Sequence, residues 1–134
     1  MPISITTTTG GTVHGNPFVG PIDQTAHVKA DLSALSTNEV DADGYLKPGV
    51  PLTAAGILVG TSPAYVFGVV PEAVKIAADN ATATLSAATD CFVAVGTVGQ
   101  VSQDIIEDNL GRSLTADELA GFNRAGSKLV LIPT

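Results

Sequence analysis

The chain has 134 residues, 45% of them apolar, and its thirteen Asp and Glu against six Lys and Arg give a formal charge of −7. This length fits one domain with its own core, and the lack of a basic cluster argues against a nucleic-acid partner. We also expect no membrane partner, because no run of about 20 apolar residues occurs. A single cysteine, Cys91, excludes an internal disulfide. The N-terminus has no basic region followed by an apolar one, so we expect the protein to stay in the cytoplasm where it is made, or in whatever is assembled there.

Residues 1–27 differ in composition from the rest of the chain. Asp23 is their only charged residue, and glycine, proline and threonine are frequent. Ile3 and Ile5 alternate with polar residues in a way that suits an added strand. We therefore predict an extended N-terminal arm over residues 1–27 that orders when it finds a sheet edge. The alternative is that this stretch is the first strand of the domain's own sheet.

A β-rich domain is predicted over residues 28–134. Its first strand is expected over residues 28–35, where apolar and polar side chains alternate. Two turn signals follow within residues 41–52. Asp43-Gly44 suits a tight turn with positive φ, and Pro48-Gly49 suits the centre of a type II turn. We predict a rigid corner formed by Asp43, Gly44, Tyr45, Leu46, Pro48 and Gly49, with Tyr45 and Leu46 anchoring it.

Further strands are expected in four apolar stretches, residues 52–58, 65–70, 74–76 and 91–101. Pro71 removes a ladder donor and marks either a bulge or the end of a strand. Residues 81–89 are small and polar, and either a weak strand or a loop fits them.

The period of the pattern changes after residue 101. Ser102 suits the N-cap of a helix over residues 103–110, and Gly111 suits its end. Thr115 to Glu118 forms a capping-box sequence for a second helix, which Gly126 would end, and residues 129–132 suit a last strand. The predicted fold class is therefore α+β: mostly antiparallel and β-rich, with short helices in the C-terminal third.

Catalytic and ligand-binding patterns are weak in this sequence. His14 and His27 have no neighbouring metal ligands, and the calcium-loop pattern around Gly44 fails because Val50 stands where a bidentate Glu is required. No phosphate-binding or nucleophile-elbow motif occurs. We expect no enzyme activity, no cofactor and no metal.

An acidic cluster on the first predicted helix also has a simple interpretation. Asp104, Glu107 and Asp108 suit a solvated helix face, and Arg112 offsets their charge. A small hydrolase that uses Asp104 or Glu107 with a histidine is the least favoured class of function.

The predicted corner carries a family resemblance. Residues 43–49, Asp-Gly-Tyr-Leu-Lys-Pro-Gly, follow an Asp-Leu-Ser element at residues 31–33 and precede a Gly-Val-Val-Pro-Glu-Ala element at residues 68–73. In this order the chain, over residues 28–134, resembles the head decoration proteins of tailed bacteriophages, the lambda decoration protein group. The resemblance implies a small virion protein on the outer surface of an icosahedral capsid, made in the host cytoplasm.

The resemblance also implies partners. Such proteins bind the major capsid (coat) protein and one another, usually as a homotrimer, and cement neighbouring capsomers. The family has no catalytic residues to carry over. We expect the arm to face the capsid, through Ile3, Ile5, Thr6, Thr8, Val13 and Phe18. The alternative is a β-rich subunit of a tail-fibre or cell-surface adhesion assembly, which should show a glycan pocket or a sequence repeat; no repeat is evident.

Overall fold

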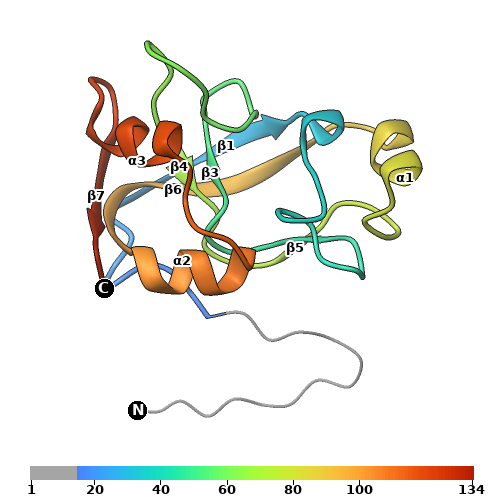
Figure 1. The fold of residues 1–134 in the computed structure, drawn as a ribbon, viewed down its shortest axis with the longest axis horizontal. Coiled ribbons are helices and arrows are strands. Elements are labelled where there is room, and N and C mark those ends of the chain that lie inside the picture. Colours follow the sequence, from blue (N-terminus) through green and yellow to red (C-terminus); the bar gives the residue numbers. More distant parts are fainter. Residues whose placement is uncertain (1–14) are drawn as a thin grey trace.

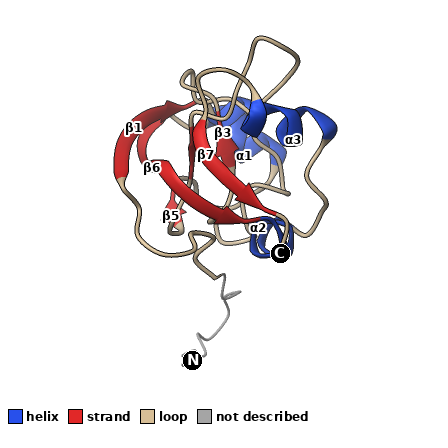
Figure 2. Ribbon diagram, turned by 90° about the vertical axis from the view of Figure 1, so that its left-hand side faces the viewer, coloured by secondary structure: helices blue, strands red, loops and turns tan. Residues whose placement is uncertain are grey.

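The longest strand, β6 (Cys91–Ser102), is the centre of the fold (Figure 1). This computed structural model describes residues 15–134, in which β6 pairs antiparallel with β1 (Gln24–Ala30) and, from Val98 onward, parallel with β7 (Lys128–Ile132). Figure 2 shows β1, β6 and β7 as a strongly curved sheet. The predicted strand over residues 91–101 is confirmed, and so is the last strand.

The remaining strands have two residues each. They are β2 (Tyr45–Leu46), β3 (Pro51–Leu52), β4 (Gly68–Val69) and β5 (Val74–Lys75). β4 joins β6 at Gly96 and pairs with β3, whereas β2 and β5 form a separate ladder. All of these pairs are antiparallel, so the prediction of a mostly antiparallel α+β fold is confirmed.

Two helices begin and are capped as the sequence predicts. In α2 (Gln103–Leu110), the Ser102 hydroxyl accepts a hydrogen bond from the Ile105 N–H, and Gly111 ends the helix with φ of 70°. In α3 (Ala116–Asn123), Thr115 and Glu118 make both hydrogen bonds of the capping box. Because each cap satisfies N–H groups that a helix leaves free at its start, both helix starts follow from local sequence. The expected end of the second helix at Gly126 is wrong, because α3 ends at Asn123 with Arg124 as its C-cap.

A third helix, α1 (Thr82–Ala87), was predicted as a weak strand or a loop. Its only buried side chain is Leu85, and the Asp79 carboxylate accepts a hydrogen bond from the Ala81 N–H just before the helix. A helix with one buried residue has no apolar periodicity to detect. Leu85 belongs to the core, so burial of that residue holds this short helix in place.

The strand predicted over residues 28–35 is observed as β1, which starts at Gln24 and ends at Ala30. β1 ends at Ala30, and a 3-10 turn (Leu32–Ala34) follows because the Asp31 carboxylate accepts a hydrogen bond from the Ser33 N–H. The predicted boundary between residues 27 and 28 falls inside β1. Residues 17–27 lie along β6, so the chain's own sheet uses this part of the predicted arm.

The strands predicted over residues 52–58 and 65–70 are mostly irregular. Gly56, with φ of 81°, turns the chain, and its Cα lies so near β1 that an added Cβ would stand 1.9 Å from the Lys29 carbonyl oxygen. The Val66 N–H donates to the Gly121 carbonyl instead of to a neighbouring strand. Contacts distant in sequence therefore override the local strand preference in both stretches.

The core is built from aliphatic side chains, as the composition implies. Side chains of β1, β6, the corner and α2 meet there, including Val28, Leu46, Val95, Val101 and Ile106, each at most 2% exposed. Small side chains keep the backbones close, and the glycines of β6 allow an aromatic ring to approach the strand.

Candidate interaction surface

The start of the described chain is fixed to α2 by one buried residue. The Asn109 side-chain amide donates hydrogen bonds to the Gly15 carbonyl at 2.8 Å and to the Pro48 carbonyl at 3.0 Å. Asn109 is 6% exposed, and its hydrogen bond to Pro48 is buried, whereas the bond to Gly15 is partly buried. This residue joins the root of the predicted arm to the predicted corner.

The end of β6 joins the first and last described segments. The Ser102 N–H donates to the Pro17 carbonyl at 2.8 Å, and the Ser102 hydroxyl donates to the Thr134 carbonyl. Pro17 and the C-terminal residue Thr134 therefore both lie at the end of β6, next to α2 (Figure 1). The predicted capsid-binding residues Ile3, Ile5, Thr6, Thr8 and Val13 lie outside the described residues.

Phe18 is part of the body, which corrects its prediction as a capsid-binding residue. It is 8% exposed, bridges to Val101 in the sheet, and its ring lies over Gly96 and Gly99 of β6. A Cβ added at Gly96 would stand 2.3 Å from the ring. Gly96 and Gly99 thus make room for the Phe18 ring.

The predicted corner has the backbone conformation that its turn residues suggest. Gly44 has φ of 84° and Gly49 has φ of 103°, as the two turn signals require. The Asp41 carboxylate accepts hydrogen bonds from the Asp43 and Tyr45 N–H groups, both at 3.0 Å. The Gly44 carbonyl accepts from the N–H groups of residues 76 and 77, so the first turn is attached to the segment directly after β5.

Only one of the two predicted anchors is buried. Leu46 is fully buried, whereas Tyr45 is 39% exposed and has the Lys75 ammonium 5.1 Å from its ring centre. The second turn is held from inside, because the Gly49 N–H donates to the Val70 carbonyl at 2.7 Å and Asn109 binds Pro48. The corner is therefore tied to both the sheet and α2.

Replacing Gly44 by alanine should lower the free energy of unfolding by about 2–3 kcal/mol, because positive φ and a steric clash act together. The new Cβ would lie 1.9 Å from the Ala77 carbonyl oxygen. Gly111→Ala is the matched control, since Gly111 also has positive φ but a Cβ added there would have nothing within 4 Å. Its loss should be about 1 kcal/mol. If urea unfolding gives the same loss of free energy for Gly44→Ala and Gly111→Ala, a Cβ at position 44 does not clash with the segment after β5.

A buried charge cluster links three further segments. Arg112 donates hydrogen bonds to the carboxylates of Glu118 (2.8 and 3.1 Å) and Glu39 (3.2 Å). Both carboxylates are nearly inaccessible, at 2% and 1% exposed. The hydrogen bonding of the Arg112 guanidinium to the Glu118 carboxylate is the main cause that raises the pKa of Arg112 above its ordinary value. Arg112 thus compensates two buried acids, and not the acidic face of α2 as the sequence suggested.

The candidate catalytic groups do not come together in the described chain. The Glu107 carboxylate accepts a hydrogen bond from the Leu114 N–H at 2.9 Å, and so stabilises the loop after α2. His27 lies on β1, opposite Ala94 of β6. Burial, with a contribution from the charge of Asp90, raises the pKa of the Cys91 thiol, which disfavours the reactive thiolate. Over residues 15–134, no group of three or more potential metal ligands gathers.

An open groove lies between β1 and the segment that precedes β4. It has a volume of about 330 Å³, and its lining includes Tyr65, Phe67, Gln24, Thr25 and Thr97. Aromatic rings beside hydroxyl and amide groups are a surface on which small polar ligands can rest.

Sequence reasoning missed the residues that hold these segments together. Asn109 stands three residues after Ile106 and directly before Leu110, on the buried side of α2, and a polar residue at such a position is the one local signal of a buried hydrogen bond. Glu39 and Arg112 are 73 positions apart, and no local pattern relates them.

The comparisons with known proteins leave the family undetermined. In the part of the chain that the structure describes, no helix has the length and hydropathy needed to cross a bilayer. The sequence matches no family model, and a search of curated proteins finds no significant relative.

Proposed function

We propose that this protein is a capsid decoration protein that binds the outer surface of an icosahedral phage capsid and bridges neighbouring coat subunits. The proposal rests on the resemblance at residues 43–49 and on the layout of the N-terminal region. Its partners are the major capsid protein and further copies of itself, as a homotrimer, and its place is the virion surface.

The observation that carries the proposal is the fixed root of an uncharged N-terminal segment. Gly15 and Pro17 are held by Asn109 and Ser102, while residues 1–14 contain no Asp, Glu, Lys or Arg. Fourteen residues reach at most about 46 Å when extended, at about 3.3 Å per residue. A segment of this length that precedes a fixed residue is suited to add a strand to a neighbouring coat subunit, where main-chain hydrogen bonds supply affinity.

A trimer would multiply this binding. Three arms from one particle bind at high effective concentration once the first arm is bound, so each contact can be weak while the assembly holds firmly. A bridge between coat subunits needs such repeated contacts. The hydrogen bonds of Asn109 to Gly15 and of Ser102 to Pro17 would pass force on the arm to α2 and the sheet.

Deleting residues 2–14 should abolish binding to matched empty heads, assembled from the coat protein of the same virus, and leave the melting temperature unchanged. The deletion stops before residue 15 because Pro17 and Phe18 belong to the body. A variant with residues 2–14 replaced by Gly and Ser at equal length is the control for reach. It should also fail to bind, because Gly and Ser lack the strand preference of the isoleucines and threonines that they replace. Occupancy equal to that of the intact chain in either variant would contradict the role of the arm.

The second candidate is a subunit of a tail-fibre or cell-surface adhesion assembly. The groove beside Tyr65 and Phe67 favours it, because aromatic rings with nearby hydroxyl and amide groups suit a sugar ring. Binding to a glycan array that is lost on Tyr65→Ala would support this function, and a chain that binds heads but no glycan would exclude it.

A further inference from the structure

β7 is an edge strand of the sheet, and one side of it is open. Its only strand partner in the described sheet is β6, and it forms the left-hand margin of the molecule in Figure 1. In a parallel pair, alternate residues of an edge strand turn their N–H and C=O groups away from the neighbouring strand. Within residues 15–134, no backbone hydrogen bond joins these outward groups of β7 to another segment. The edge is therefore available to a strand of another molecule.

β7 lacks the features that keep many edge strands from pairing. Natural edges carry charges or prolines in the strand, or a loop covers them. β1 is closed at its end by the turn at Gly56, whose carbonyl accepts a hydrogen bond from the Asp31 N–H. In β7 the one charged residue, Lys128, stands at the start, and Pro133 follows the last residue. The apolar residues 129–131 are left as the open middle of the edge.

The outer face of the sheet beside this edge is apolar. Val130 is 55% exposed, and Gln100 lies directly opposite it on β6. Val19 lies on the other side of Gln100, because its N–H donates to the Gln100 carbonyl, and it is 45% exposed. Two of the five large exposed hydrophobic side chains in the described chain thus lie in one row of the sheet. Exposed apolar side chains next to an open edge indicate a surface that another molecule covers.

A second copy of β7 complements this edge. In an antiparallel pair centred on Val130, this residue lies opposite itself, and Leu129 lies opposite Leu131. Lys128 lies opposite Ile132, so the two lysines are about 14 Å apart along the strands, at about 3.4 Å per residue. A parallel pair in register would instead place lysine against lysine, which is destabilising. The sequence Lys-Leu-Val-Leu-Ile therefore favours pairing with its own copy about a two-fold axis.

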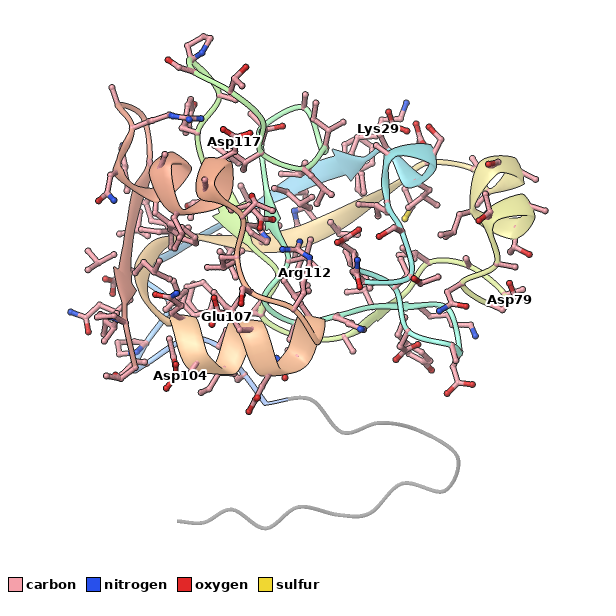
Figure 3. All side chains as sticks on the ribbon, viewed as in Figure 1. Lys29, Asp79, Asp104, Glu107, Arg112 and Asp117 are labelled. Atoms are coloured by element: carbon pink, nitrogen blue, oxygen red, sulfur yellow. The ribbon has the colours of Figure 1, made fainter. Side chains whose placement is uncertain are left out.

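Charge also matches in the antiparallel pair. Lys128 of one copy comes to the end of the other copy's β7, where Ile132 pairs with Ser102 and α2 follows. Asp104, in the first turn of α2, is exposed and lies near this end of β7 (Figure 3). Lys128 forms no ion pair with the described part of its own chain, and Asp23 lies across β6 from it. The two-fold axis repeats the approach of lysine to aspartate at both ends of the contact.

We infer that two copies of this chain pair through β7, antiparallel and centred on Val130, so that one sheet continues from copy to copy. Main-chain hydrogen bonds between the two edges hold the pair together, and Val130, with Val19 beside it, supplies apolar area. The contact has two-fold symmetry. It is therefore separate from the three-fold contact of the proposed trimer, and it does not rest on the proposed function.

A disulfide at the centre of the pair is the direct test. In Val130→Cys, with the free Cys91 replaced by serine, the two new thiols should join on mild oxidation. Residues directly opposite in an antiparallel pair have Cβ atoms only about 4.5–5.5 Å apart. Lys128→Cys in the same background is the matched control, since its two thiols would be about 14 Å apart and should stay reduced. A mixture of Lys128→Cys and Ile132→Cys should cross-link, because these positions lie opposite each other.

The mass of the full chain in solution, measured by light scattering over a range of concentrations, tests the contact without a cross-link. Val130→Lys places two like charges at the centre of the pair and should raise the concentration of half-dissociation at least about tenfold. Phe92→Lys is the matched control, since Phe92 is 67% exposed near the start of β6, and it should leave the mass unchanged. Because both replaced side chains are exposed, the melting temperatures in dilute solution should stay close to that of the unchanged chain.

The inference is overturned if Val130→Lys leaves the mass unchanged, or if position 128 alone cross-links as fast as position 130. Head binding is measured on the same proteins. A Val130→Cys chain that cross-links but never binds heads would contradict the proposed function alone. A chain that binds heads but does not cross-link at position 130 would contradict the β7 contact alone.

Discussion

Replacing Arg112 by methionine should lower the free energy of unfolding at neutral pH by about 3–5 kcal/mol, the largest loss that we expect from a single charge. The substitution leaves the carboxylates of Glu39 and Glu118, at 1% and 2% exposed, without the cation that compensates them. Removing one partner from a buried ion pair is costly because the remaining charge stays desolvated. Urea unfolding followed by circular dichroism measures the loss.

Neutralising the acids separates this cause from lost packing. In the triple variant Arg112→Met with Glu39→Gln and Glu118→Gln, no charge remains buried, so we expect it to recover at least about half of the loss. Gln at position 118 can also keep the capping box that starts α3. A triple variant no more stable than Arg112→Met would mean that Arg112 acts through its packing.

Replacing Phe18 by alanine should lower the free energy of unfolding by about 3–5 kcal/mol, because it empties the space over Gly96 and Gly99 that the ring fills. Val19→Ala is the adjacent control. Val19 is 45% exposed, so Val19→Ala should lower the free energy of unfolding by no more than about 0.5 kcal/mol. A small effect of Phe18→Ala would mean that this residue belongs to the arm, as the composition of residues 1–27 first suggested, and not to the core.

The parts of the fold that local chemistry determines were predictable. β6 is recognisable as a nearly continuous apolar run, and α2 and α3 are recognisable from Ser102 and the Thr115–Glu118 capping box, because a cap satisfies N–H groups within one turn. The positive φ of Gly44 and Gly49 follows from the turns that they occupy. In each case the residues that determine the structure are neighbours in sequence.

The remaining features depend on contacts between distant residues. α1 is held by one buried leucine, Leu85, which leaves no periodic pattern. The two-residue strands β3 and β4 stop early because their flanking residues bind Gly121 and β1 instead. No composition rule could show that Phe18 reaches the glycines of β6 from an uncharged, threonine-rich segment, or that Arg112 joins Glu39 to Glu118.

The most direct test of the proposed function is co-sedimentation of the intact protein with matched empty heads, followed by heating of the complex. If the protein decorates capsids, it should pellet with the heads, saturate at a fixed ratio to the coat protein, and raise the temperature at which the heads rupture. A protein that stays in the supernatant and leaves the rupture temperature unchanged would contradict the proposal, whatever its oligomeric state.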